Sequence, residues 1–323
     1  HTKMSSKKQA RDKTEKADVE DEKNADEYQC SGKVEVDFPG LCGLLDIKDI
    51  PAVRTKQSIP AEYSWSKPCL QVELENEDSL SAKCLKVSGW KVNEQIARVL
   101  QKMLPSLRQV QSLQFWQAGL SDRMVISLIS TISLCSNLRV VTLEGNPLPE
   151  SSYHHLLSEN SILTHLSLRN NQIGDESARL LGAALSTSKS SNKNLLSLNL
   201  AFNSIGDVGA AHIAQGLRLN CALRFLSLSN NRIGDSGAAH LSTILGEFAL
   251  THEEVVERRK LRLERMQSVS VAVCNIHNHS TSNLSSLVCV KLSSSDVKAP
   301  HSKGGKPGGK EKQLTAQEVP NIF

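Results

Sequence analysis

Apolar residues recur along the middle of the chain in the pattern L-x-x-L-x-L-x-x-N-x-I-x-D, where x is mostly polar. Three copies fit this pattern closely, and they start at Leu163, Leu195 and Leu223. Three weaker copies precede them, so that six units begin at residues 82, 110, 138, 163, 195 and 223. The spacings are 28, 28, 25, 32 and 28 residues. A period near 28 residues kept over six units predicts a solenoid of stacked repeats.

Each unit predicts one strand followed by one helix. Leucines at the fourth and sixth positions alternate with polar residues, which places both on the buried face of a short strand. The segments 176–185, 208–217 and 236–245 contain mainly small and aliphatic residues and predict helices. We therefore expect an α/β fold: a curved solenoid with parallel strands on its concave face, helices on its convex face and disordered tails.

Two polar positions of the unit indicate how neighbouring repeats are joined. The ninth position is asparagine in the last four units: Asn146, Asn171, Asn203 and Asn231. The chain turns there, and a buried amide can pair with the backbone groups that the turn leaves free, so we predict a structural asparagine ladder. The thirteenth position is acidic in all six units and precedes a helix, where a carboxylate accepts orphan amides and opposes the helix dipole.

The pattern also sets the domain boundaries. Residues 1–30 alternate basic and acidic side chains and predict a disordered tail, and 31–81 predict an N-terminal cap region with a strand-like run at its end. The solenoid is expected over 82–250. The charged segment 251–267 predicts a capping helix, and the Ser-rich and then basic stretch 268–323 predicts a disordered tail.

Composition narrows the function classes. The net charge of +4, from 38 basic and 34 acidic residues, is too balanced to indicate a nucleic-acid partner or a membrane surface. No apolar run approaches the roughly 18 residues of a transmembrane helix, and no signal peptide is evident. The 8 cysteines form no C-x-x-C pair, which is typical of reduced thiols in an intracellular protein. We expect a cytoplasmic monomer.

Candidate binding residues lie where the strands face away from the helices. Large apolar side chains on an exposed concave face often contribute most of the binding energy for a protein partner. The alternative is that flanking loops cover them. A basic and an acidic residue at the same position of adjacent units either contact the partner or pair with each other. The predicted partner-binding residues are Trp116, Glu144, Arg169, Phe202 and Phe225.

Other motifs predict no catalytic, cofactor or metal site. The stretch GGKPGGKE at 304–311 nearly matches a phosphate-binding loop, but Glu311 replaces the hydroxyl that would hold magnesium. Cys274, His277 and His279 are plausible metal-ligand types, yet no further ligand accompanies them. We therefore expect a protein that is not an enzyme.

The repeat resembles the ribonuclease-inhibitor class of leucine-rich repeats, shared by the Ran GTPase-activating protein and NOD-type receptors. The stretches QVELENED (71–78), LEGNPLPESSYH (143–154) and FALTHEEVVERRKL (248–261) resemble the vertebrate family of leucine-rich repeat-containing protein 71. This resemblance covers roughly residues 30–265 and implies a leucine-rich-repeat solenoid, no enzymatic activity and a link to ciliated cells. The tail from Ser268 departs from the family pattern.

Three functional hypotheses remain. The first is a non-catalytic scaffold that binds a protein partner through the concave face. The second is a GTPase-activating type of regulator, which follows only from fold analogy with the Ran GTPase-activating protein. The third is nucleic-acid binding by the basic tail 296–312, which would be strongly salt-dependent.

Overall fold

The computed structural model describes residues 25–55, 68–186, 193–218, 220 and 222–278 of the chain. These residues divide into two compact units, one that ends at Gly246 and one that begins at Glu247. The first unit contains the repeats. The second contains one long helix.

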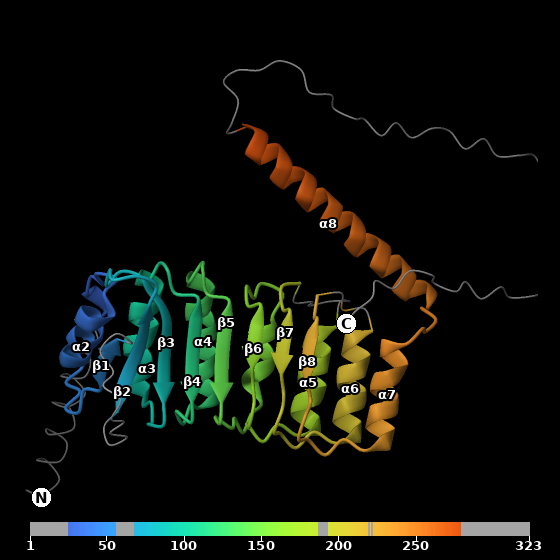
Figure 1. Cartoon of the computed structure of the whole chain (residues 1–323), viewed down its shortest axis with the longest axis horizontal. Helices are drawn as coiled ribbons and strands as arrows, with labels where there is room; N and C mark the ends of the chain where they lie inside the picture. Colours follow the sequence, from blue (N-terminus) through green and yellow to red (C-terminus); the bar gives the residue numbers. More distant parts are fainter. Residues whose placement is uncertain (1–24, 56–67, 187–192, 219, 221, 279–323) are drawn as a thin grey trace, which may run out of the picture. The chain divides into compact units, whose positions relative to one another are not determined.

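A single eight-stranded sheet runs through the first unit, with the strands in chain order (Figure 1). Neighbouring strands are parallel except β2 and β3, which are antiparallel. The strands are β1 Ala52–Thr55, β2 Cys69–Leu74, β3 Ala82–Ser88, β4 Ser112–Trp116, β5 Val140–Glu144, β6 His165–Ser167, β7 Ser197–Asn199 and β8 Phe225–Ser227. The last six come from the six predicted units, which confirms the predicted α/β repeat with a parallel sheet.

Helical segments alternate with these strands and form a second row beside the sheet (Figure 1). They are α2 Val34–Leu44, α3 Glu94–Met103, η2 Leu104–Ser106, α4 Asp122–Leu134, η3 Ser152–Leu157, α5 Asp175–Leu185, α6 Asp207–Leu217 and α7 Asp235–Leu245. Close packing of α5 on α6 requires glycine, because a Cβ on Gly216 would lie 2.1 Å from the Gly182 carbonyl oxygen. The small residues of these segments therefore set the distance between helices.

The strand register follows the repeat unit. Leu166, Leu198 and Leu226 occupy the fourth position of successive units and are paired across β6, β7 and β8. Leu166 and Leu198 are only 2% and 1% exposed, and Leu200 at the sixth position is fully buried. Equivalent positions therefore stack along one continuous aliphatic core.

The third unit differs from its neighbours. The six-residue 3-10 helix η3 stands where the flanking units have α4 and α5, of 13 and 11 residues. A shorter helical segment needs fewer residues to return to the next strand, which explains why residues 138 and 163 are only 25 apart.

The N-terminal region extends the core of the repeats. Asp37 of α2 is fully buried, and its carboxylate accepts hydrogen bonds from the amides of Ser31 and Gly32 at 2.9 and 2.8 Å. Ala25 is 4% exposed within the same core. The folded part therefore begins before the boundary at residue 30 that the charge pattern indicates, because apolar residues interrupt the charged run there.

The second unit contains α8, His252–Asn278. This helix begins one residue into the charged segment 251–267 and continues for eleven residues beyond its end, into the stretch predicted as a tail. Extension of a formed helix costs little compared with its nucleation, which accounts for the extra turns. Its role as a cap stays a prediction. Residues 1–24 and 279–323, which include the phosphate-loop-like motif and His279, lie outside the described residues.

Candidate functional site

The four ladder asparagines join successive units through their side-chain amides. Asn203 accepts hydrogen bonds from the backbone amides of Asn171 and Ile173, at 2.8 and 3.1 Å. Its Nδ2 donates to the carbonyl oxygens of Leu168 and Leu200, at 3.0 and 2.9 Å. Each ladder asparagine bonds the turn of the preceding unit, and Asn146, Asn203 and Asn231 also bond their own turn.

The same arrangement recurs along the array with decreasing burial. Asn146 is fully buried, Asn171 is 2% exposed and Asn203 is 8% exposed. Asn146 accepts from the Ala118 amide at 2.9 Å, and Asn231 accepts from the Ile205 amide at 3.0 Å. The ladder is therefore part of the core in the inner units and partly solvated in the last one.

A second ladder is formed by the aspartates at the thirteenth position. Asp175 Oδ1 accepts from the amides of Gly206 and Gly209, at 2.7 and 3.0 Å. Asp207 contacts Gly234 and Gly237 in the same way and at the same distances. The sequence suggested that each carboxylate serves the helix that it begins, whereas the structure shows that it caps the helix of the following unit. The glycine N-caps have no side chain of their own, so the preceding repeat supplies the acceptor.

This aspartate ladder gives a prediction with an internal control. Asp207→Ala should lower the free energy of unfolding by about 1–2 kcal/mol, since the N-terminus of α7 loses its acceptor. Asp235→Ala removes the equivalent carboxylate of the last unit, which accepts no hydrogen bond from any described residue, and should change stability little. Chemical denaturation of both variants measures the difference. Equal losses would show that the carboxylates act through their own helices.

The predicted binding residues fall into a cluster and one separate member. The Arg169 guanidinium lies 4.2 Å from the ring centroid of Phe202 and 3.8 Å from a carboxylate oxygen of Glu144. Ser167 Oγ donates to the same carboxylate at 2.6 Å. These four residues are called the Arg169 cluster below. They belong to three successive units and lie on the sheet face, the side of the strands turned away from the helices.

Trp116 and Phe225 lie at opposite ends of the strands. Trp116 is the last residue of β4, is 38% exposed and is in register with Glu144, which places it next to the Arg169 cluster. Phe225 is the first residue of β8, is 66% exposed and is in register with Ser197. The structure therefore brings four of the five candidates together and leaves Phe225 apart. The aromatic side chains of Trp116, Phe202 and Phe225 are exposed rather than covered by flanking loops. Arg169 and Glu144, which lie at the same position of adjacent units, pair with each other.

Phe202 occupies an unusual backbone position that the sequence analysis missed. The eighth residue of every unit has a positive φ, and the values for Phe202 and Asn230 are 58° and 54°. The other units place glycine, glutamine or asparagine there: Gly89, Gln117, Gly145 and Asn170. Glycine and asparagine adopt this left-handed conformation readily, while a bulky aromatic residue does so at a cost of about 1–3 kcal/mol. A comparison of the residue types at the eighth position of all units would have indicated this conformation from the sequence.

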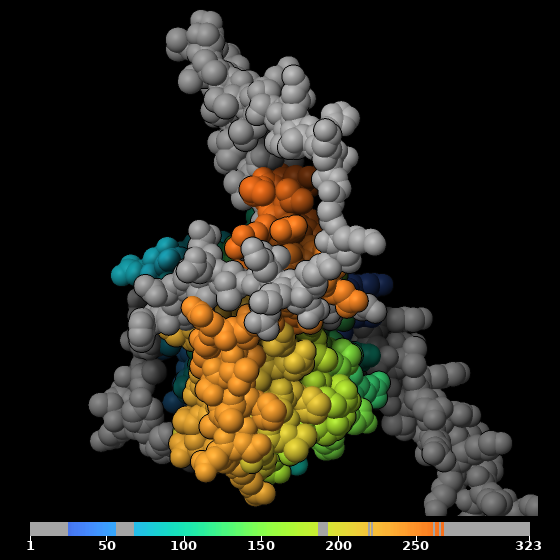
Figure 2. All heavy atoms as spheres, turned by 90° about the vertical axis from the view of Figure 1, so that its right-hand side faces the viewer, coloured from blue at the N-terminus to red at the C-terminus, as the bar shows by residue number. Residues whose placement is uncertain are grey.

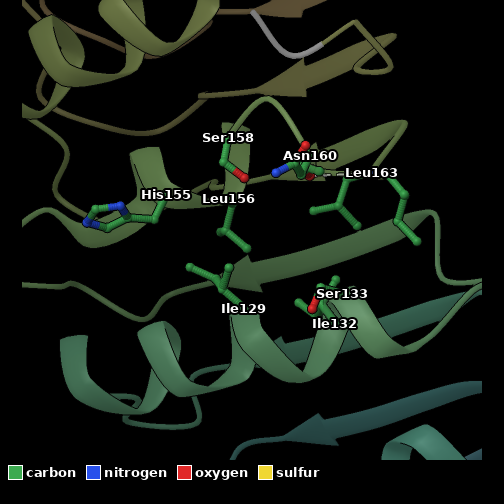
Figure 3. A pocket seen from close by; sticks show the side chains of 10 residues that line it. Ile129, Ile132, Ser133, His155, Leu156, Ser158, Asn160 and Leu163 are labelled. Carbon is green, nitrogen blue, oxygen red and sulfur yellow. Dashed lines mark hydrogen bonds between the residues drawn. The ribbon is translucent and has the colours of Figure 1, made fainter. Parts of the chain in front are cut away.

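A second surface feature lies on the helical side, between α4 and the segment around η3. Figure 3 shows this hollow, which forms where η3 replaces a longer helix. The lining residues are Ile129, Ile132, Ser133, His155, Leu156, Ser158, Asn160, Ser161, Ile162 and Leu163. Burial, together with the neighbouring His154, lowers the pKa of His155, so the imidazole is neutral near pH 7. Half of the lining residues are aliphatic, and the lining has no pair of charged groups that could perform acid–base chemistry.

The described residues offer no evident chemistry elsewhere. Burial raises the pKa of the Cys42 and Cys135 thiols to about 11, which keeps both protonated and poorly nucleophilic. No group of three or more His, Cys, Asp or Glu residues in the described ranges could hold a metal ion. Among the described helices, none is long and apolar enough to cross a membrane.

Comparisons with known proteins identify the repeats. Residues 159–182, 191–214 and 219–242 each match the family described as Leucine Rich repeat. The chain therefore carries leucine-rich repeats in its three best-fitting units.

Two solved structures are similar to part of this chain. The tropomodulin C-terminal domain of Caenorhabditis elegans is 16% identical, with 59% of this chain and 93% of that chain covered and a TM-score of 0.32. The structure titled Leiomodin-1 Actin-Binding Site 2 is 13% identical, with 55% and 83% covered and a TM-score of 0.29.

Proposed function

We propose that the chain is a non-catalytic protein-interaction scaffold that binds a protein partner on its sheet face, centred on the Arg169 cluster. Leucine-rich repeats are consistent with a protein-binding role. The rigid sheet presents side chains from successive units at fixed spacing, while the buried positions of the same strands maintain the fold. The two tasks are thereby separated within each unit.

The observation that supports this proposal most directly is the identity of residue 202. The left-handed backbone makes phenylalanine an unfavourable choice for stability, and 45% of its surface is exposed, so burial does not offset the cost. A costly residue that does not serve the core is the kind of feature expected at a functional site. Its ring is held in place by the guanidinium of Arg169.

The surroundings of Phe202 fit a protein partner. Ser167 donates to the Glu144 carboxylate, which pairs with Arg169, so the arginine charge and the adjacent ring form one surface. Trp116 adds a second exposed aromatic side chain on the neighbouring strand ends. Aromatic residues and arginine are the residue types most enriched among interface hot spots. Binding by such a surface needs no cofactor or metal.

The finer parts of the proposal rest on the sequence. The cysteine pattern and the composition lead us to place the chain in the cytoplasm, as a monomer. The resemblance to the family of leucine-rich repeat-containing protein 71 connects the partner with ciliated cells.

The test replaces Phe202 with asparagine, the residue that two other units have at this position. Phe202→Asn should leave the melting temperature unchanged or raise it, because asparagine adopts the left-handed conformation more easily. Partner affinity should fall by about 1–2 kcal/mol or more if Phe202 is a hot spot. Proximity labelling in ciliated cells, with wild-type and variant chains compared at equal expression, identifies the partners that depend on Phe202.

Phe225→Ser is the matched control, since it removes an exposed phenylalanine from the other end of the strands. Partners lost with Phe202→Asn and retained with Phe225→Ser bind at the Arg169 cluster. Retention of every labelled partner in both variants would exclude the sheet face as the binding surface.

A further inference from the structure

Each inner repeat joins the following one through the same backbone contacts. The amides of the sixth and eighth residues donate to carbonyl oxygens of the next unit. These bonds are Leu168 to Asn199 at 2.8 Å, Asn170 to Ala201 at 3.1 Å, Leu200 to Ser227 at 2.8 Å and Phe202 to Ser229 at 2.9 Å. Together with the asparagine and aspartate ladders, they form a set of polar contacts that recurs at the last two junctions.

The sixth unit repeats the same donors and acceptor, but no described residue pairs with them. The equivalent donors are the backbone amides of Leu228, Asn230, Asn231 and Ile233, and none of them has an acceptor in the described ranges. The acceptor in the sixth unit that is equivalent to Asp175 and Asp207 is the carboxylate of Asp235. Figure 2 looks onto this end of the array, with α7 in orange toward the viewer.

The apolar side chains of the sixth unit are similarly uncovered. Leu185 ends α5 and is fully buried, whereas Leu245 ends α7 at the same position and is 79% exposed. Leu228 and Ile233 are only partly buried, although their counterparts Leu200 and Ile205 are fully buried. The surface formed by Leu228, Ile233, Asp235, Leu241 and Leu245 is called the end face below.

We propose that the end face binds one further strand–turn–helix unit supplied by a partner protein, parallel to β8 and in register with it. The chemistry of the end face specifies this occupant. The partner strand must accept the Leu228 and Asn230 amides, and a side-chain carbonyl after it must accept those of Asn231 and Ile233. The partner helix must begin with uncapped amides, which Asp235 then caps as Asp207 caps α7.

A second copy of this chain, bound through its own end face, would fit the end face less well than such a partner unit. The amides at the N-terminus of its α7 are already bonded to its Asp207, so none remain for Asp235. Two-fold pairing would also bring two Asp235 carboxylates to one interface without compensation.

The helix α8 does not supply the polar groups that the end face requires. Its N-terminus is capped internally: Thr251 Oγ accepts from the Glu254 amide at 3.2 Å, and Glu254 accepts from the Thr251 amide at 2.8 Å. Its apolar residues do not gather on one side, and a helix offers no edge carbonyl groups to β8. The polar groups of the end face require a strand followed by an uncapped helix.

The test uses a labelled synthetic peptide of residues 195–217, which copies the fifth unit, together with the full 323-residue chain. Fluorescence anisotropy should show saturable binding to the wild-type chain. Leu245→Lys should weaken it by at least about tenfold, because a charge replaces exposed apolar surface at the interface. Val208→Lys is the matched control, since Val208 is 61% exposed on α6, and it should bind as the wild type does.

A second peptide tests the specific contact with Asp235. In the array, a Cβ on Gly209 would lie 2.6 Å from the capping Asp175 oxygen. The peptide with Gly209→Ala should therefore bind several-fold more weakly than the parent peptide, and Asp235→Ala in the chain should reduce that difference.

Three results would overturn the proposal. The first is no saturable binding to the wild-type chain, and the second is binding that Leu245→Lys does not change. The third is self-association of the chain, seen as concentration dependence in sedimentation, that blocks peptide binding. The last result would identify a second copy as the occupant. Phe202→Asn should bind the peptide normally, so failure of the sheet-face proposal and failure of this one are distinguishable.

Discussion

Leu200→Ser is expected to lower the free energy of unfolding by about 3–5 kcal/mol. Leu200 is fully buried at the sixth position of the fifth unit, between units that stack on both sides of it. The substitution leaves a cavity and adds a hydroxyl that has no partner in an aliphatic core. Since a typical domain is stable by only about 5–15 kcal/mol, this single change removes a large share of the total. Thermal unfolding followed by circular dichroism measures the loss.

The backbone of Leu200 also takes part in the asparagine ladder, which adds to the expected loss of stability in Leu200→Ser. Its carbonyl oxygen accepts from the side-chain amides of both Asn203 and Asn231, each at 2.9 Å. A shift of the backbone at Leu200 therefore disturbs two rungs of the asparagine ladder. Phe202→Asn, only two residues away but on the sheet face, is the control and should melt no earlier than the wild type. If Phe202→Asn melts early and Leu200→Ser does not, the assignment of the two faces is wrong.

Periodicity predicted the strands and most of the helices because every unit solves the same packing problem. Positions four and six must be apolar to fill the core, so the pattern survives in the sequence. The third unit departs from the expected helix, since a 3-10 helix of six residues stands between its strand and the next. The hydrophobic pattern shows which residues are buried, but it does not show the length or type of the helical segment between successive strands.

The contacts between units were harder to predict. The aspartate that begins each helix caps the next one, and this becomes visible only when two units are stacked at their actual separation. The Arg169 cluster is likewise visible only in the stacked array. Its members come from three units whose first residues are separated by 25 and 32 residues in the sequence. The left-handed conformation of Phe202 could have been anticipated by aligning the eighth position of all units.

Asn203→Asp is expected to destabilise the array by more than Asn203→Ala, for which we expect about 1–3 kcal/mol. Alanine removes a side chain that makes hydrogen bonds with five backbone groups. The carboxylate of the aspartate variant keeps the acceptor for Asn171 and Ile173, but it places a charged oxygen against the carbonyls of Leu168 and Leu200. The Leu168 carbonyl loses its side-chain donor, and the Leu200 carbonyl keeps only the one from Asn231. A buried charge that faces acceptors costs more than an empty site.

The last repeat offers the matched control for this charge effect. Asn231 makes the same kinds of bonds but is partly exposed, so water can solvate a carboxylate there, and Asn231→Asp should cost clearly less than Asn203→Asp. Chemical denaturation of the three variants gives the order Asn203→Asp, then Asn203→Ala, then Asn231→Asp, from most to least destabilised. Equal stability of Asn203→Asp and the parent would mean that the ladder asparagine contributes no donor to the fold. A loss from Asn231→Asp as large as that from Asn203→Asp would show instead that the end face is covered in solution.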